Sequence, residues 1–438
     1  MTHSKAENSE EELQRHHSLP GKLWVYMKSL GPGLITGASD DDPSGIATYA
    51  QTGAQFGYAQ LWTTLFTLPL MTAVQEICAR IGLETGDGLA EIIRRNYPRP
   101  VLYVCVSLLV IANTINLGAD LGAMAAAAQL LLGIPFIVWL VIMTIVSAVL
   151  EIFVDYNRYA KVLRFLTFSL FAYVFVVFVV PQDWGQAIRS TIIPTLRLDK
   201  DFLLNLVALL GTTISPYLFF WQANQEVEEE IDEGKATDAE REGVTQTELR
   251  WMRTDVTAGM VISNIISWFI IVTTASTLFR NGVKDIDSAT KAAEALRPFA
   301  GDLAYLVFAV GIIGTGLLAV PVLAGSAAYV VAETFHLREG LSLKWKQAPG
   351  FYSVIAISIL VGASINLIGI NPIQALYYTA VLNGIVAPPL LVMIMLISSN
   401  RKIMKDATNG PVANGLGWLT TIVMLVASVA LLISLIVR

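Results

Sequence analysis

The chain has few of the side chains on which soluble enzymes and disulfide-bonded domains depend. Two of its 438 residues are cysteine, four are histidine, and 15% are charged, against about 25% in soluble domains. Cys78 and Cys105 lie in apolar stretches and form neither a disulfide framework nor a zinc-ligand spacing. The histidines, at positions 3, 16, 17 and 336, lie outside those stretches, and no nucleophile stands beside a base. We therefore expect no enzyme and no bound cofactor.

Apolar sequence dominates instead. Hydrophobic residues make up 54% of the chain, and they gather in stretches of about 20 residues, enough for a helix to cross a hydrocarbon core of roughly 30 Å. Inside that core the backbone must satisfy its own hydrogen bonds, which a helix does. The sequence predicts an all-α integral membrane protein with eleven transmembrane helices, at residues 29–57, 60–83, 101–133, 135–155, 163–181, 202–225, 255–280, 302–333, 351–370, 372–398 and 416–437.

The distribution of Lys and Arg predicts the orientation of these helices. With a cytoplasmic N-terminus, 21 of the 29 basic residues fall on the inner side, as expected for loops that stay in the cytoplasm. Residues 1–28 are then a cytoplasmic tail, and residues 399–438 are a cytoplasmic loop and an eleventh helix that ends outside. We expect a multi-pass protein of the plasma membrane, such as a bacterial inner membrane.

Two spans do not resemble plain helices. GPGLITGASDDDPSGIATYA (31–50) places three aspartates before Pro43, and GTTISPYLFFWQANQ (211–225) contains Pro216. Proline removes a backbone donor and clashes with the preceding turn. An intramembrane aspartate costs about 2.5–3.5 kcal/mol, so it is by default a candidate for a functional residue. Each proline lies in the first helix of a five-helix block. The pattern predicts a transport core at 29–398 built from inverted repeats 29–181 and 202–398, with the substrate at two broken helices.

At these residues the chain resembles the NRAMP family of divalent metal transporters. The likeness extends from GPGLITGASDDDPSGIATYAQTGAQFGY through ETGDGLAEIIRRNYPRP to the eleven spans. It implies a LeuT-like fold and a metal site formed by a D-P-G-N motif in helix 1 and an A-x-x-M-P-H motif in helix 6. The motif Asp falls on Asp42, but the Asn falls on Gly45, the Ala on Thr212, the Met on Ser215 and the His on Tyr217.

These departures change the kind of metal ion that the site is expected to prefer. A thioether favours transition metals, so Ser215 in its place leaves oxygen donors, which suit hard ions. Gly45 and Ser215 are also smaller than Asn and Met, which predicts a wider cavity for an ion that keeps part of its water shell. Mg²⁺ is such an ion, although oxygen ligands suit Mn²⁺ too. The chain thus looks most like the NRAMP-related magnesium transporter branch.

The resemblance also bears on proton coupling. Of the family's acidic pair in span 3, Asp120 matches the first member, and the second falls on Ala123. With the histidine absent as well, we expect uncoupled transport driven by the membrane potential. The expected metal-site residues are Asp42, Ser39, Gly45, Thr212 and Ser215, followed by Asp41, Tyr217, Gln222, Asp120 and Asn383. Which of the three adjacent aspartates binds the ion stays open.

The favoured function is uptake of Mg²⁺, with Mn²⁺ as a further cargo, by alternating access at the two breaks. The alternatives are a proton-coupled importer of Mn²⁺ or Fe²⁺ and a LeuT-like transporter of a small organic solute. The expected partners are the divalent cation and the lipid bilayer, with a monomeric transport unit and no nucleic acid. The acidic run from Glu226 to Glu233 is either a solvated helix end or a funnel for cations at the cytoplasmic mouth.

Overall fold

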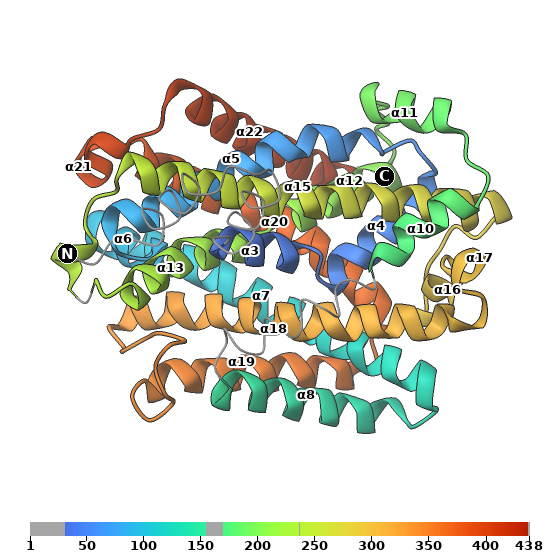
Figure 1. Cartoon of the computed structure of the whole chain (residues 1–438), viewed down its shortest axis with the longest axis horizontal. Coiled ribbons are helices and arrows are strands. Elements are labelled where there is room, and N and C mark those ends of the chain that lie inside the picture. Colours follow the sequence, from blue (N-terminus) through green and yellow to red (C-terminus); the bar gives the residue numbers. More distant parts are fainter. Residues whose placement is uncertain (1–30, 155–169, 236, 437–438) are drawn as a thin grey trace, which may run out of the picture.

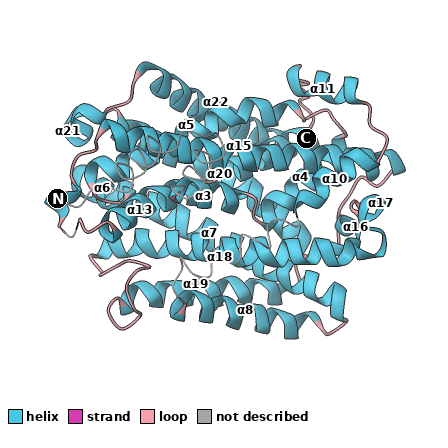
Figure 2. Cartoon of the chain, in the orientation of Figure 1, coloured by secondary structure: helices cyan, strands magenta, loops and turns pink. Residues whose placement is uncertain are grey.

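The structure, a computed structural model, describes residues 31–154, 170–235 and 237–436, and all regular elements in these ranges are helical (Figure 2). The predicted tail at 1–28 and the start of the fifth span lie outside them. Figure 1 shows the helices of the predicted spans running roughly along one axis. They are α3 (Pro32–Asp40), α4 (Pro43–Phe56), α5 (Trp62–Thr85), α7 (Arg99–Leu132), α8 (Phe136–Phe153), α10 (Phe171–Val179), α12 (Lys200–Thr213), α13 (Pro216–Asp232), α15 (Gln246–Thr277), α18 (Ala304–Phe335), α19 (Pro349–Ile365), α20 (Pro372–Ser398) and α22 (Pro411–Ile436).

Short helices occupy the connections between these spans. They are α6 (Leu89–Asn96), α11 (Trp184–Ile192), α14 (Asp238–Arg241), α16 (Ala289–Glu294), α17 (Arg297–Ala300) and α21 (Arg401–Met404), with 3₁₀ turns η2 (Phe279–Asn281), η3 (Gly301–Leu303), η4 (Asn366–Ile368) and η5 (Lys405–Ala407). In Figure 1, α6 and α21 lie at one end of the long axis and α11, α16 and α17 lie at the other.

The predicted all-α membrane architecture is confirmed. Eight helical segments of the described ranges are long and apolar enough to cross a bilayer. The other three predicted spans correspond to the interrupted pair α3 and α4, to α5 with its charged C-terminal half, and to the fifth span, of which the described part contains α10. Large apolar side chains remain exposed on these helices, among them Leu132, Phe178 and Ile357 at 60% or more. Such exposure is expected of surfaces that face lipid.

The first half of the first span, α3, lies directly on the backbone of α15. A Cβ atom on Gly37 would stand 2.3 Å from the carbonyl carbon of Gly259, and one on Gly33 would stand 2.5 Å from the amide nitrogen of Val256. Glycine is therefore required for this approach, as in other close helix contacts in membranes. The second half, α4, also packs on α15, at Gly53 against Thr274.

The start of α3 is capped from another helix. No side chain of its own caps it, but the carboxylate of Asp255 on α15 accepts hydrogen bonds from the backbone amides of Gly31 (2.9 Å), Gly33 (2.6 Å) and Leu34 (3.2 Å). A carboxylate at a helix N-terminus satisfies otherwise unpaired donors and interacts favourably with the helix dipole. Asp255 thus fastens α3 to α15 at the end opposite the break.

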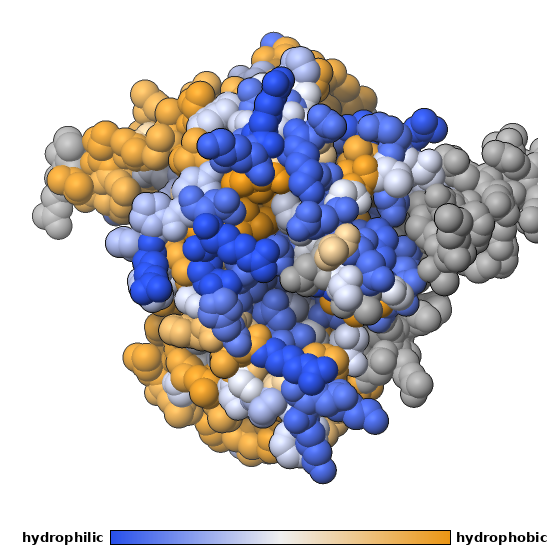
Figure 3. Space-filling view, turned by 90° about the vertical axis from the view of Figure 1, so that its left-hand side faces the viewer, coloured by the Kyte–Doolittle hydropathy of each residue, from blue (hydrophilic) through white to orange (hydrophobic). Residues whose placement is uncertain are grey.

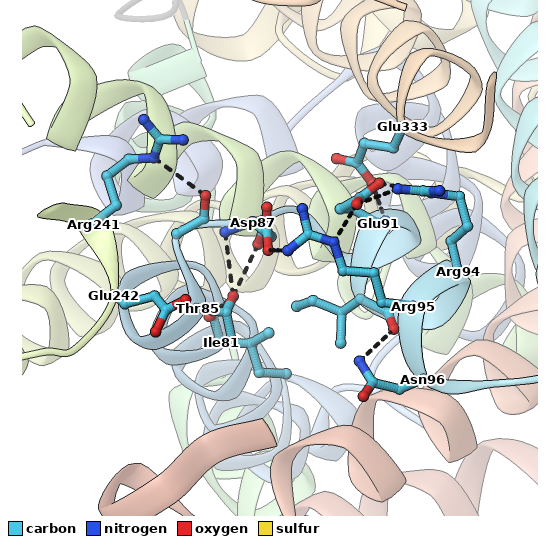
Figure 4. Close-up of polar contacts among 12 residues, drawn as sticks. Ile81, Thr85, Asp87, Glu91, Arg94, Arg95, Asn96, Arg241, Glu242 and Glu333 are labelled. Carbon is cyan, nitrogen blue, oxygen red and sulfur yellow. Dashed lines mark hydrogen bonds and ion pairs between the residues drawn. The ribbon is translucent and has the colours of Figure 1, made fainter. Parts of the chain in front are cut away.

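The end of the molecule that carries α6 is polar. Figure 3 shows hydrophilic residues over this face and hydrophobic ones along its flanks. In Figure 4, Glu91 lies between two guanidinium groups of α6, those of Arg94 and Arg95, while Arg95 also reaches Asp87 at 2.6 Å. Burial raises the pKa of Glu91, but the two guanidinium groups outweigh it and hold that pKa below its usual value. Glu333 of α18 accepts the amide of Glu91 at 2.9 Å, which fixes α6 to α18.

The acidic run after the sixth span forms the last turns of α13 and its C-cap Glu233, so it is a helix end, but it is not solvated throughout as predicted, because Glu226 and Glu230 are buried. Its side chains also have hydrogen-bond and ion-pair partners. Glu228 accepts the Tyr329 hydroxyl (2.8 Å), and Glu230 pairs with Lys235 (2.6 Å). The alternative role as a funnel for cations stays a prediction.

Candidate metal centre

The first span breaks where the sequence predicts. α3 ends at Asp40, Asp41 leaves the helical region with ψ 45°, and Asp42 is extended with ψ 171° before α4 begins at Pro43. Asp42 is the N-cap of α4: its Oδ1 accepts the amide of Gly45 and the hydroxyl of Ser44, each at 2.7 Å. Proline fits the first position of a helix because its missing N–H needs no acceptor there.

The sixth span breaks in the same way. α12 ends at Thr213, Ile214 has ψ 63°, and Ser215 is the extended N-cap of α13, which begins with Pro216. The hydroxyl of Ser215 lies 2.7 Å from the carbonyl oxygen of Thr212 and 3.1 Å from that of Gly211, so it donates back to the end of α12. Its oxygen keeps lone pairs for another partner. Both predicted interruptions are therefore confirmed.

The carboxylate of Asp42 joins three helices. Its Oδ2 lies 3.2 Å from the hydroxyl of Tyr217 on α13 and accepts the amide of Asn116 on α7 at 3.3 Å. The Tyr217 hydroxyl is also 3.1 Å from the backbone carbonyl of Ser39. Asp42 is 1% exposed, so its charge is withdrawn from bulk water and is stabilised by these donors. The two breaks thus meet, as expected.

Further oxygen atoms near this junction have no hydrogen-bond partner in the described ranges. Both carboxylate oxygens of Asp120, one turn after Asn116 on α7, are of this kind, as are Ser39 Oγ and Asn116 Oδ1. Asp120 is fully buried. Buried oxygens are normally paired, so such a group needs an ion, a proton or water. These atoms could hold a cation or its water shell.

Gly45 does not leave the extra room that the sequence predicted. A Cβ atom on it would lie 3.0 Å from the carbonyl oxygen of Asp40, 3.2 Å from Thr212 Oγ1 and 3.4 Å from the ring of Tyr49. The space into which an asparagine would point is thus closed by these neighbours. The prediction of a wider cavity is therefore wrong at Gly45. Thr212 lies beside the break at this position.

Asp40 and Asp41 have other partners than Asp42. Both are buried and share the hydroxyl of Ser263 on α15, which lies 2.8 Å from Asp40 Oδ2 and 3.2 Å from Asp41 Oδ1. Their hydrogen bonds run to α15, whereas those of Asp42 run to α4, α7 and α13. This division favours Asp42 as the central ligand.

Two other expected site residues lie less centrally. Gln222 accepts the hydroxyl of Thr36 (2.5 Å) and donates to Glu226 (2.8 Å), so it links α3 to the polar end of α13. Asn383 is buried in α20, and its Nδ2 has no partner in the part of the chain that the structure describes. No hydrogen bond described for either residue reaches Asp42, and their roles as ligands stay predictions.

Asn116 and Ser263 contact the aspartates but were absent from the expected site. Asn113, Asn116 and Asp120 recur at spacings of three and four, which puts them on one face of a helix, and this spacing is the signal for Asn116 that the sequence contains. Asn113 on the same face has a packing role, donating to Ser326 Oγ (2.6 Å) and the carbonyl of Leu323 (3.1 Å) on α18. For Ser263 the sequence held no comparable signal.

The atoms at this junction that could bind a cation are oxygens. Within the described residues, no three His, Cys, Asp or Glu side chains lie close enough together to hold a metal. A cation at Asp42 would therefore take most of its ligands from hydroxyls, carbonyls, an amide or water. Hard cations accept such ligands.

Comparison with known proteins decides the family. The family model described as "Natural resistance-associated macrophage protein-like" (Nramp) matches residues 33–434. This chain belongs to the Nramp family. It is also similar to the divalent metal cation transporter MntH of Klebsiella pneumoniae subsp. pneumoniae, with 28% identity over 95% of each chain, and to MntH of Bacillus subtilis, with 26% identity over the same shares.

Solved structures show the same fold. The Eremococcus coleocola manganese transporter, in complex with an aromatic bis-isothiourea compound, aligns with a TM-score of 0.72 at 20% identity, covering 96% of this chain and 87% of the other. MhsT in complex with L-phenylalanine aligns at 0.58 with 13% identity, over 93% and 98%. The Nramp chain therefore has the LeuT-like fold with broken helices 1 and 6. It is a multi-pass membrane transporter and not an enzyme.

Proposed function

We propose that this Nramp chain takes up Mg²⁺ by uncoupled alternating access, with Mn²⁺ as a second cargo. Transport of a divalent metal cation follows from the family and from the relatives named MntH. The central ligand is Asp42, assisted by Ser39, Thr212, Ser215 and Tyr217. The remaining candidates, Asp41, Gly45, Asp120, Gln222 and Asn383, contribute through the water shell or the path.

The observation that carries this proposal is the hard donor set around Asp42. The Asp42 carboxylate accepts hydrogen bonds from the Asn116 side-chain amide and from the Tyr217 and Ser44 hydroxyls. Ser215 supplies an oxygen where the family motif has a methionine. Mg²⁺ binds one or two carboxylates and keeps several waters. The unpartnered oxygens of Asp120, Ser39 and Asn116 can accept hydrogen bonds from those waters.

The membrane potential suffices to drive uptake. At about 100 mV a doubly charged ion gains about 4.6 kcal/mol on entering the cell, which supports a gradient of roughly a thousandfold. No coupled proton is required.

Uptake of Mg²⁺, Mn²⁺ and Ca²⁺ into proteoliposomes tests the proposal, with a pH-sensitive dye to follow protons. We expect Mg²⁺ uptake that Asp42→Asn abolishes and Ser215→Met weakens relative to Mn²⁺. Asn113→Ala, on the same face of α7 but bonded to α18, is the control and should keep full uptake. Full Mg²⁺ uptake by Asp42→Asn, or proton flux that follows metal flux, would overturn it.

Proton-coupled import of Mn²⁺ is the second candidate, and two observations favour it. Asp120 is a buried acid without a partner in the described ranges, which suits a proton carrier. In addition, the thioether of Met124 on α7 and the ring of Pro43 at the first break both lie against Gly316 of α18. Competition between Mn²⁺ and Mg²⁺ separates the candidates, since Mn²⁺ should block Mg²⁺ uptake at far lower concentration if the second is correct.

We also propose the topology that the basic residues predict. The N-terminus is cytoplasmic, the C-terminus lies outside, and the polar face with α6 and α21 is the inner face of a bacterial plasma membrane (Figure 3). The inverted repeats are 29–181 and 202–398, and the transport unit is a monomer. Labelling of single cysteines at positions 402 and 284, from either side of the membrane, tests the orientation.

A further inference from the structure

A side pocket of about 620 Å³ opens between α5, α15 and the start of α22. These helices lie side by side, since α5 packs against both of the others (Figure 1). The lining residues are of two kinds. Leu68, Pro69, Val261 and Leu416 are apolar, whereas Glu76, Arg80 and Arg253 are charged.

The charged residues gather at one end of the pocket. Arg80 and Glu76 lie in the second half of α5, and Arg253 lies near the start of α15, which runs the opposite way. Arg253 Nε is 2.6 Å from Glu76 Oε1, and Arg80 Nη2 is 3.9 Å from the same oxygen. Two guanidinium groups therefore face one carboxylate, and this end carries a net positive charge.

Arg80 is the unusual member of this group. It is 3% exposed, yet its Nε and Nη2 have no hydrogen-bond partner in the described part of the chain. Guanidinium is always charged and offers five donors in a planar fork that fits two oxygens of a phosphate. A buried donor without an acceptor is costly. The arrangement of these charged side chains therefore suits an anionic group bound beside Arg80.

The rest of the pocket suits an acyl chain. Leu68 and Arg80 are twelve residues apart on α5, which is about 18 Å of helix at 1.5 Å per residue. The surface around the opening is apolar as well: Phe66, Ile262 and Val412 are 44%, 45% and 75% exposed. The pocket therefore opens on a flank that faces lipid tails, with its charged end where two long basic side chains can reach the headgroup level.

We propose that this pocket binds an anionic phospholipid, with its phosphate on Arg80 and Arg253 and its acyl chains along α5 and α22. Basic pockets between transmembrane helices recognise lipid headgroups in this way. The assignment concerns a lipid of the surrounding bilayer and not a soluble anion, because most of the lining is apolar. It stands apart from the metal centre and from the nature of the transported ion.

Lipid binding to the purified full-length protein tests this site. Native mass spectrometry and thermal unfolding in detergent would compare dioleoyl-phosphatidylglycerol, dioleoyl-phosphatidylcholine and inorganic phosphate. We expect the anionic lipid to bind and to raise the Tm, and the other two to do so much less. Arg80→Gln and Arg253→Gln should each weaken binding roughly fivefold, and Val261→Trp should weaken it by filling the apolar part.

Arg401→Gln is the matched control, since Arg401 is an exposed arginine outside the pocket and should keep full binding. If Arg80→Gln fails to fold, the half-exposed Arg253 still provides the test. Unchanged affinity for phosphatidylglycerol in Arg253→Gln, or equal binding of phosphatidylcholine, would overturn the proposal. A Tm shift of equal size with inorganic phosphate would also overturn it, by indicating a site for free anions.

Discussion

The clearest mechanical prediction concerns Asp255, which caps α3 from α15. In the wild type, the Asp255 carboxylate accepts the amides of Gly31, Gly33 and Leu34 at 2.6–3.2 Å. The Asp255→Ala substitution removes this acceptor. Loss of an N-cap costs about 0.5–2 kcal/mol, and hydrogen bonds to a charged group are worth about 1.5–3 kcal/mol. If inward opening requires α3 to leave α15, a loss of about 2 kcal/mol favours the open form roughly thirtyfold.

Thiol labelling measures this change. Cys78 and Cys105 are both buried, so replacing them with alanine leaves a background for one cysteine on α3, at Leu34. A membrane-impermeant maleimide should label that cysteine about thirty times faster in Asp255→Ala, and Asp255→Asn should be intermediate because one oxygen remains.

Asp302→Ala serves as the control, because the Asp302 side chain is fully exposed and should not affect the rate. Equal labelling rates in the Asp255→Ala protein and the control would refute the reasoning. They would mean that the close contacts of Gly33 and Gly37, and not the carboxylate, hold α3 in place.

Three further outcomes follow from the same contacts. Asn116→Ala should raise the Mg²⁺ concentration for half-maximal uptake about fivefold, because a hydrogen bond to Asp42 worth about 1 kcal/mol is lost, while Asn113→Ala should leave it unchanged. Asp120→Asn should not alter the pH profile of uptake between pH 5.5 and 8 in proteoliposomes; a flattened profile would support proton coupling. Burial and neighbouring carboxylates raise the pKa of Glu339 far above the ordinary 4.5. The folded state therefore binds an extra proton above pH 4.5 and loses stability as pH rises, so thermal unfolding of Glu339→Gln should depend less on pH.

The sequence predicted the two breaks well because local chemistry dictates them. A proline, an extended residue before it and an uncompensated charge in an apolar span all exclude a continuous helix. The capping of α4 by Asp42 follows from the usual preference for aspartate at the N-cap, whereas Ser215 holds the N-cap position of α13 without a side-chain cap. The charged half of α5 and the acidic end of α13 were equally visible as local features.

Contacts between distant segments could not be predicted in this way. Asp42 meets Asn116 across 74 residues and Tyr217 across 175, and Asp255 caps α3 across more than 220. Only the Tyr217 contact was anticipated, since the family motif placed that residue at the site. The room beside Gly45 was misjudged because the packing of Thr212 and Tyr49 is tertiary, and residue size alone does not determine it.

Helix α15 connects the N-terminal end of α3 with the proposed lipid pocket. Arg253, Thr257 and Val261 recur every four residues and line the pocket, whereas Asp255 and Gly259 face α3. Residues four apart share one face of a helix, so the two sets lie on different sides. A bound lipid can shift the position of α3 only if its affinity differs between the closed and open forms. The ion pair of Arg253 with Glu76 links α15 to α5, so a lipid phosphate on Arg253 would alter this contact between the two helices.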